Sequence, residues 1–244
     1  MNSQKIISLI SLILISCSSE NTKQIEANLL IEPNFEFSAE FFECKLNDGY
    51  TLLNLESFLS TLVRSDLEQN NVKYDINVYF PKPNYVNQFT INVKNYSDQD
   101  IYNYILDRLS RRGFDEIAGC KFDKEELFGQ SLLANEIEIN NPDYVSEILR
   151  CEYNKGYNFG TFRIAIERFS LEIKSLNISY EALYLHNKDY PNSFIWINNI
   201  YKDNFSSEIN ANWINNPIAE NVKKEFQENA KCIDSKIYDA FLIT

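Results

Sequence analysis

The stretch Cys44-Lys45-Leu46-Asn47-Asp48-Gly49-Tyr50 decides the fold, because it occurs a second time as Cys151-Glu152-Tyr153-Asn154-Lys155-Gly156-Tyr157. Four of the seven residues are identical, at an offset of 107. Tyr85-Val86-Asn87-Gln88-Phe89 returns as Tyr190-Pro191-Asn192-Ser193-Phe194 at an offset of 105, and Cys120 is matched by Cys232 at 112. Three matches in the same order indicate a duplicated unit of about 100 residues. We expect the units over residues 37–128 and 144–244, with a linker over 129–143.

Within the first unit, apolar residues change from a spacing of two to helical spacing and back. Phe42, Cys44 and Leu46 alternate with charged residues and predict a strand that ends at a turn. A helix is expected after this turn, then strands over 74–80 and 89–94. Ser97-Asp98-Gln99-Asp100 resembles a capping box that opens a second helix, and a last strand follows Cys120.

The second unit repeats this order, so the pattern is βαββαβ twice. Its expected elements are a strand over 144–153, a helix around 162–173, a hairpin over 180–198, a helix begun at Asn216-Pro217 and a strand over 233–242. This is the pattern of ferredoxin-like folds. Two such units in one chain resemble the fused form of the dimeric α/β-barrel superfamily, which includes small monooxygenases, isomerases and haem-handling proteins. The resemblance implies an α+β fold of two tandem ferredoxin-like modules, and it implies no particular activity.

Four cysteines in these units allow three disulfide pairings, and spacing alone does not choose among them. The ferredoxin-like fold places the first and last strands side by side, so the resemblance implies Cys44 bonded to Cys120 and Cys151 bonded to Cys232. Four buried free thiols are the alternative. A metal site is not expected, because the chain has one histidine and no Cys-x-x-Cys.

The N-terminal residues predict the location. Residues 1–16 have a basic start, a short apolar core and a small residue at the end, which is typical of a cleaved secretory signal peptide. Leu14-Ile15-Ser16-Cys17 resembles the bacterial lipobox, which implies a diacylated (palmitate-type) Cys17 at the start of a tether over 17–36. The same resemblance implies the periplasmic face of the outer membrane, because Ser18 and not Asp follows Cys17. An ordinary signal peptide with an incidental cysteine is the alternative.

Composition and charge exclude two classes of protein. With 23 Lys+Arg against 35 Asp+Glu, the net charge is −12, which has the wrong sign for binding nucleic acid. The hydrophobic content of 44% excludes a disordered chain. Because an acidic body is repelled by anionic lipid, the acyl chains have to supply the membrane anchor.

Polar residues on one face of the expected strands are the candidate site. Opposite the helix-covered face we expect Glu43, Lys45, Asp75, Asn77, Tyr79, Thr90, Asn92, Arg150, Glu152 and Glu181. If the two sheets pack face to face, these side chains line a cavity for a small polar ligand; alternatively, the face is solvated or covers an envelope protein. Trp196, Trp213 and the tyrosines could also form a stacking surface for sugars or aromatic ligands.

The catalytic candidates are Glu43, Arg150 and His186. His186 is the only imidazole, and Phe80 at its repeat position favours a structural role. We find no phosphate loop, nucleophile elbow, metal set or cofactor motif. The leading expectation is therefore a membrane-anchored binding or interaction module without a cofactor. The alternative is a cofactor-independent enzyme that uses the polar cavity between the modules, and a third hypothesis is a haem-handling protein with His186 as axial ligand.

Overall fold

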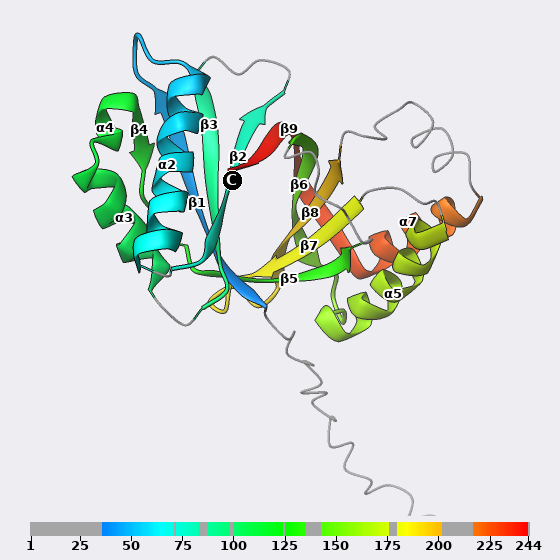
Figure 1. Ribbon diagram of the computed structural model, residues 1–244. Helices are drawn as coiled ribbons and strands as arrows, with labels where there is room; N and C mark the ends of the chain where they lie inside the picture. Colours follow the sequence, from blue (N-terminus) through cyan, green and yellow to red (C-terminus); the bar gives the residue numbers. More distant parts are fainter. Residues whose placement is uncertain are drawn as a thin grey trace, which may run out of the picture. The chain divides into compact units, whose positions relative to one another are not determined.

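The repeated sequence folds into two copies of one arrangement of strands and helices in the computed structural model (Figure 1). The structure describes residues 36–70, 72–82, 87–97, 100–123, 125–134, 143–175, 180–201 and 217–243. The expected signal peptide over 1–16, the lipidation site Cys17 and Trp213 lie outside these residues. None of the described helices is both long and apolar enough to cross a lipid bilayer.

Both modules follow the order βαββαβ, which confirms the α+β fold of two tandem ferredoxin-like modules. Module 1 contains β1 (Phe37–Leu46), α2 (Leu52–Asn70), β2 (Tyr74–Pro81), β3 (Gln88–Asn95), α3 (Ile101–Arg111), α4 (Phe114–Ile117) and β4 (Ala118–Lys121), followed by β5 (Leu127–Ala134). Module 2 contains β6 (Asp143–Tyr153), α5 (Phe159–Ser175), β7 (Tyr180–His186), β8 (Ser193–Tyr201), α7 (Pro217–Asn229) and β9 (Ala230–Ile243).

Two details differ from the sequence expectations. Asp100, and not Ser97, caps α3, since its Oδ1 accepts a hydrogen bond from the backbone N–H of Asn103 at 3.2 Å. The expected linker over 129–143 begins inside a strand, because residues 127–134 form β5. This strand forms because the edge of β7 and the start of β1 offer it hydrogen-bonding partners on both sides.

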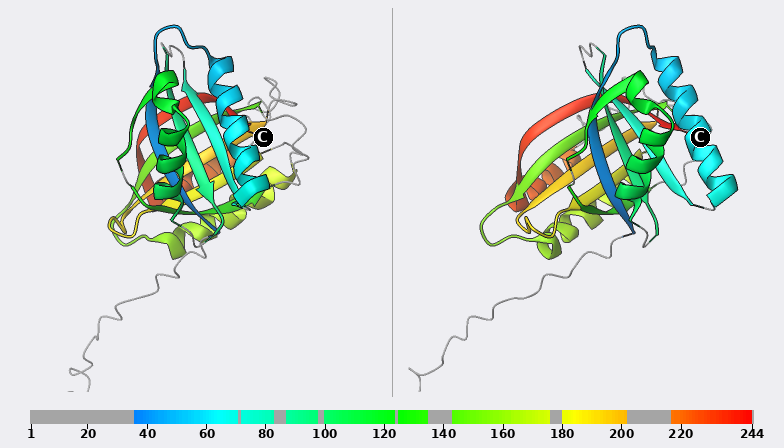
Figure 2. Two further views of the ribbon diagram at one scale, coloured as in Figure 1. Left: turned by 60° about the vertical axis from the view of Figure 1, so that its left-hand side comes forward. Right: turned by 90° about the vertical axis from the view of Figure 1, so that its left-hand side faces the viewer.

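The two modules complete each other's sheet. The strand order is β4-β1-β3-β2 in module 1 and β9-β6-β8-β7 in module 2. The second half of β9 continues beyond β6 and pairs with β2, while β5 pairs with β7 and β1. Because β1 also pairs with β3, eight strands close into a ring, which we call the barrel. Figure 2 shows this ring from two further sides, with the helices on its outer face.

The identical residues of the repeat have the same structural roles in both modules. Asn47 Nδ2 donates to two backbone carbonyls at the end of α4, at 2.8 and 3.0 Å, and Asn154 Nδ2 does the same at the end of α7. Gly49 and Gly156 adopt φ of 88° and 89°, in the left-handed region that glycine enters without steric cost. The repeat thus encodes the turn that joins the first strand of each module to its first helix, α2 or α5.

Disulfides join Cys44 to Cys120 and Cys151 to Cys232, which confirms the pairing that the resemblance implies. The two cysteines of each pair lie directly opposite each other in the register of β1 with β4 and of β6 with β9. Sequence separations of 76 and 81 residues close long loops, so each disulfide stabilises the fold by about 4 kcal/mol in the chain-entropy treatment.

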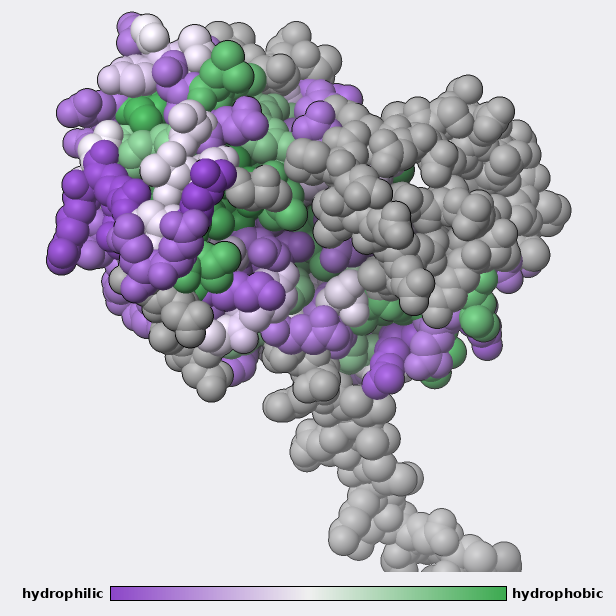
Figure 3. Space-filling model, viewed as in Figure 1, coloured by the Kyte–Doolittle hydropathy of each residue, from purple (hydrophilic) through white to green (hydrophobic). Residues whose placement is uncertain are grey.

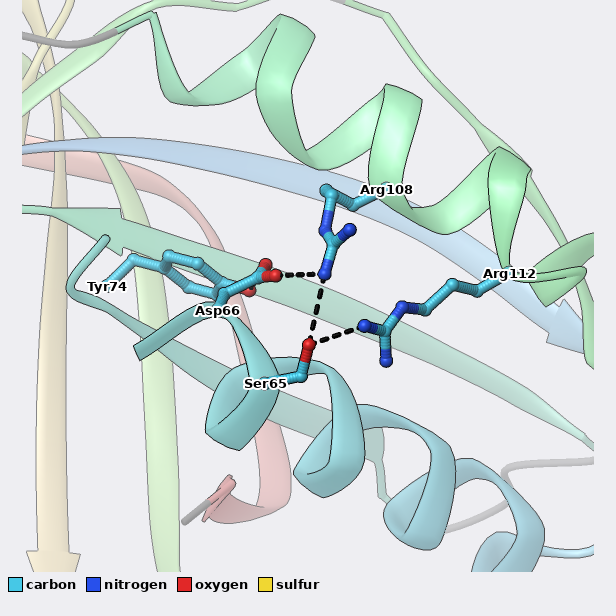
Figure 4. A network of polar contacts seen from close by, with 5 residues as sticks. All are labelled: Ser65, Asp66, Tyr74, Arg108 and Arg112. Carbon is cyan, nitrogen blue, oxygen red and sulfur yellow. Dashed lines mark hydrogen bonds and ion pairs between the residues drawn. The ribbon is translucent and has the colours of Figure 1, made fainter. Parts of the chain in front are cut away.

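A buried ion pair joins the two long helices of module 1 (Figure 4). Asp66 of α2 is fully buried, pairs with Arg108 of α3 and accepts a hydrogen bond from the Tyr74 hydroxyl at 2.7 Å. Ser65 Oγ accepts hydrogen bonds from Arg108 and Arg112. Because a buried carboxylate without a cation is strongly destabilising, this network holds α2 against α3.

The surface of module 1 carries both hydrophilic and apolar side chains. The face shown in Figure 3 is mostly hydrophilic where it is coloured, with scattered apolar groups. Leu53 on α2 is one exposed apolar side chain of this module, at 75% exposure. Isolated residues of this kind are normal on a protein surface.

Candidate functional site

The inner face of the barrel carries the polar residues that the sequence places opposite the helices. Their neighbours along the strands, such as Phe42 and Cys44 on β1 or Ile76 on β2, pack under the helices. Because successive side chains of a strand point to opposite faces, the residues between them point into the barrel. This applies to Glu43, Lys45, Asp75, Asn77, Tyr79, Thr90, Asn92, Arg150, Glu152 and Glu181.

Five buried side chains form what we call the polar wall: Asn77, Tyr79, Tyr144, Ser146 and Asn199, each at most 4% exposed. They come from β2, β6 and β8, and β9 runs between β2 and β6. Tyr79 and Tyr144 both lie opposite Ala240 of β9, and Ser146 lies opposite Asn199. The small side chain of Ala240 thus separates two tyrosine rings whose centroids are 6.3 Å apart.

Hydrogen bonding satisfies the polar wall only in part. The Tyr144 hydroxyl donates to Asn77 Oδ1 at 2.7 Å, and Asn199 Nδ2 donates to Glu181 Oε2 at 2.9 Å. Within the described part of the chain, Asn77 Nδ2, Ser146 Oγ and Asn199 Oδ1 have no hydrogen-bond partner. A buried polar atom without a partner costs about 1–3 kcal/mol, so three of them on one surface require an explanation.

The opposite side of the barrel is apolar, although it derives from the same repeat. Phe37, Ala39, Leu127, Leu183, Leu185, Ile195 and Ile197 form one buried cluster there. The pair of Asn77 with Asn92 in module 1 corresponds to the pair of Leu183 with Ile197 in module 2. The two copies have therefore diverged inside the barrel, where one wall is polar and the other is hydrophobic.

Glu181 is the carboxylate beside the polar wall. It is half-buried, and its Oε2 accepts hydrogen bonds from Asn199 and from the Tyr201 hydroxyl, the latter at 3.4 Å. Asp75 occupies the corresponding place in module 1, where it accepts a hydrogen bond from the Tyr96 hydroxyl at 2.8 Å. The repeat thus places a carboxylate with a tyrosine partner at two positions of the barrel, and only Glu181 is bonded to the polar wall.

Burial keeps the tyrosines of this region in their neutral form. Desolvation raises the pKa of Tyr79, Tyr144 and Tyr201 above the ordinary value of 10.0, and the negative charge of Glu181 raises all three further. A neutral phenol is a hydrogen-bond donor throughout the physiological pH range. The region therefore combines neutral donors with one carboxylate, an arrangement that can accept a proton and stabilise a developing oxyanion.

The structure does not bring the three catalytic candidates of the sequence analysis together. Glu43 and Arg150 lie on the inner face as expected, where the charge of Arg150 lowers the pKa of Tyr238 and that of Glu43 raises it. Both residues are exposed, and the Glu43 side chain is 73% accessible. His186 lies on the outer face, where its ring stacks on Tyr184. Tyr144, Ser146 and Asn199 were not among the candidates, although the alternation along β6 and β8 places them on the same face.

A large cavity also lies on the outer face of module 2, between its sheet and helices α5 and α7, with a volume of about 1210 Å³. Its size makes it the cavity to compare with the haem site of the third hypothesis, in which His186 is the axial ligand. Among the described residues, its lining contains no histidine, methionine or free thiol, since Cys151 and Cys232 are joined in a disulfide and His186 is not a lining residue. These residues do not fit a haem site with His186 as axial ligand.

Comparisons with known proteins identify the fold. No protein-family model and no curated protein match the sequence. A putative monooxygenase from Lactobacillus acidophilus has a similar structure, with a TM-score of 0.55 and 11% identity over 86% of this chain and 95% of that one. A putative monooxygenase from Fusobacterium nucleatum has a TM-score of 0.57 and 9% identity, over 87% of this chain and 94% of that one. A mutant chlorite dismutase from Candidatus Nitrospira defluvii has a TM-score of 0.53 and 9% identity, over 85% of this chain and 92% of that one.

These similarities correct the leading expectation from the sequence. The fold is that of dimeric α/β-barrel proteins, and the similar structures are monooxygenase-like proteins and a chlorite dismutase. The leading expectation of a non-catalytic binding or interaction module is therefore corrected, because the structures that share this fold are putative monooxygenases and a chlorite dismutase. At 9–11% identity the likeness establishes the fold and not the reaction.

Proposed function

We propose that the protein is a cofactor-independent enzyme of the dimeric α/β-barrel type, with its active site on the polar wall. The observation that supports this is the set of buried polar atoms without partners, Asn77 Nδ2, Ser146 Oγ and Asn199 Oδ1, beside the carboxylate of Glu181. Unsatisfied buried groups are rare in folded proteins, and a polar substrate is one kind of partner that satisfies them. The apolar wall opposite suits the hydrocarbon part of such a substrate.

The arrangement fits removal of a proton from a carbon next to a carbonyl group. Glu181 is the base: Oε2 is held by Asn199 and Tyr201, which leaves Oε1 to accept the proton. The electron pair of the broken bond moves to the carbonyl oxygen, which becomes an oxyanion. Asn77 Nδ2 donates to this oxyanion. Tyr144 is a positioning residue, because its bond to Asn77 Oδ1 directs the amide N–H groups of Asn77 toward the interior.

The test is turnover of a panel of small carbonyl and phenolic compounds without added metal or cofactor. Deuterium incorporation from heavy water reports proton abstraction, and oxygen uptake reports the reaction of the putative monooxygenases that share the fold. Glu181→Gln should lower kcat by about 10²- to 10⁴-fold, because the amide cannot accept the proton. Asp75→Asn, the change at the repeat position, is the matched control and should leave kcat within a factor of a few.

Asn77→Leu introduces the residue type of Leu183, which holds the corresponding position on the apolar side of the barrel. It should lower kcat by about 10²- to 10³-fold, because the leucine side chain cannot donate to the oxyanion. Proton exchange that survives both Glu181→Gln and Asn77→Leu would show that the reaction takes place elsewhere. A thermal-shift comparison of the variants with the unchanged protein separates loss of activity from loss of folding.

We also propose that the enzyme is a lipoprotein anchored through Cys17 to the periplasmic face of the outer membrane. The support is the lipobox-like sequence Leu14-Ile15-Ser16-Cys17 after an apolar core, with Ser18 following it. Mass spectrometry of the N-terminal peptide from membranes should find a diacylated Cys17 as the first residue, and Cys17→Ser should release the protein from the membrane fraction. An unmodified peptide that retains residues before Cys17 would contradict the proposal.

A further inference from the structure

The cavity on the outer face of module 2 has an aromatic lining. Phe162 and Phe169 of α5, Phe226 of α7 and Trp196 of β8 pack on one another, with the centroid of Phe226 5.0, 5.5 and 5.5 Å from those of Phe162, Phe169 and Trp196. These rings are among the residues that line the half-open cavity of about 1210 Å³, which is large enough for an organic ligand.

A carboxylate on the sheet side of this cavity is held by neutral groups only. Glu147 Oε2 accepts a hydrogen bond from Asn198 Nδ2 at 2.8 Å, and its Oε1 accepts one from Ser235 Oγ at 3.1 Å. Asn198 Oδ1 in turn accepts from the Tyr180 hydroxyl at 2.5 Å and from Trp196 Nε1 at 2.6 Å. This network fixes the orientation of the carboxylate beside the aromatic rings.

No described residue pairs a positive charge with Glu147. Lys223, Lys224 and Lys231 also line the cavity, but none is within ion-pair distance of Glu147 among the described contacts, and Lys224 pairs with Glu220 at 3.3 Å. A half-buried carboxylate beside aromatic faces is a favourable position for a cation, because opposite charge and the ring quadrupoles attract it together.

Module 1 carries different, buried side chains at the corresponding places. Glu40 is the repeat partner of Glu147 at the offset of 107, and it is 4% exposed. Leu55, Leu59 and Leu62 of α2 are fully buried in the core beneath the helices of module 1. The aromatic lining is therefore particular to module 2, since Phe162 and Phe169 correspond to Leu55 and Leu62 of module 1 at the same offset.

We propose that this cavity is a second ligand site, which binds an organic amine as its ammonium cation. The ammonium group lies against Glu147, and the hydrocarbon or aromatic body of the amine lies against Phe169, Trp196 and Phe226. The site is on the opposite side of the sheet from the polar wall, so it does not depend on the proposed reaction.

The test is calorimetric titration of the full chain with phenethylammonium and, as its neutral counterpart of similar shape, 2-phenylethanol. The unchanged protein should bind the ammonium at least about tenfold more tightly than the alcohol. Glu147→Gln keeps the hydrogen-bonding shape but removes the charge, so it should abolish this preference. Glu152→Gln, an exposed position on the other face of the same strand, is the matched control and should keep it.

Three results would overturn the proposal: no binding of either probe, equal binding of both by the unchanged protein, or an undiminished preference in Glu147→Gln. Equal binding would show an apolar cavity without ammonium recognition. The comparison of the two probes needs no variant, so it decides the question even if Glu147→Gln is unstable. Loss of activity on Glu181→Gln with unchanged ammonium binding would separate this site from the proposed active site.

Discussion

Gly129 of β5 lies opposite Phe37 of β1, and a Cβ atom at this glycine would lie 2.3 Å from the Phe37 ring. The corresponding pair in module 2 is Ala240 opposite Tyr144. A small residue therefore accommodates an inward-pointing aromatic ring at equivalent places in both halves of the barrel. Ala240 packs with Tyr79 and Tyr144 of the polar wall, while the ring of Phe37 fills the space at Gly129.

Gly129→Ala should lower the free energy of unfolding by about 1–3 kcal/mol, because the buried Phe37 ring has to move from a packed position. Urea denaturation followed by circular dichroism measures this change. Gly119→Ala is the matched control, since a Cβ there has no atom within 4 Å, and it should change stability by less than about 0.5 kcal/mol. Equal stability of the two variants would mean that the contact at Gly129 is not tight.

Strand alternation alone identifies which side chains face the barrel interior, but not how deep they lie. Asn77, Tyr79 and Glu181 follow from alternation and prove to be in or beside the polar wall. Glu43 and Arg150 follow from the same alternation, yet they are exposed. Depth depends on which strands from the other module cover a position, and one module's sequence does not contain that information.

At the scale of helices and strands, the buried pair of Asp66 with Arg108 joins two helices of module 1. Its partners come from α2 and α3, which are joined in sequence only through the hairpin of β2 and β3. On the same helix, Arg111 pairs with Asp107 at 2.7 Å, and this pair is exposed. The two ion pairs allow a direct comparison of burial.

Arg108→Ala should lower the free energy of unfolding by about 3–5 kcal/mol, because Asp66 would keep a buried charge without its cation. Arg111→Ala, at the exposed pair, should cost at most about 1 kcal/mol. Adding Asp66→Asn to Arg108→Ala should recover part of the loss, and denaturation curves of the variants test this. A double variant less stable than Arg108→Ala would argue against an unpaired charge as the cause.

The long elements could be predicted from the sequence, whereas β5 and α4 could not. The strands β1 and β6 carry alternation and the repeated cysteines, so their positions follow, while the pairing of the two disulfides follows only from the resemblance to the ferredoxin-like fold. Leu127–Ala134 has no such alternation, and its strand conformation depends on pairing with β7, more than 45 residues later. With four residues, α4 is too short to show a helical period.

At the scale of the whole molecule, buried tyrosines couple stability to alkaline pH. Burial raises the pKa of Tyr79, Tyr144, Tyr153, Tyr180, Tyr184 and Tyr201 above the ordinary value of 10.0, and that of Tyr184 reaches about 12. The unfolded chain therefore loses these protons near pH 10, while the native chain keeps them.

The free energy of unfolding should be insensitive to these groups below about pH 9 and fall as the pH rises above about 10. Each buried tyrosine lowers the free energy of unfolding by up to about 1.4 kcal/mol per pH unit in this range, because the unfolded chain has lost the phenol proton that the native chain still holds. Urea denaturation at a series of pH values gives the slope, and phenolate absorbance shows whether ionisation accompanies unfolding. Stability that stays constant to pH 11 would contradict the burial of these hydroxyls.

The pairing of β2 with β9 has a consequence for biosynthesis. Pro81 of β2 pairs with Tyr238 of β9, so the edge of β2 is synthesised long before the strand that covers it. Until then, an exposed strand edge is available to any other extended chain, which is a recognised route to aggregation. Contacts so distant in sequence also form slowly. We therefore expect a chain that ends before β9 to aggregate more readily than the full chain, because the edge of β2 then stays unpaired.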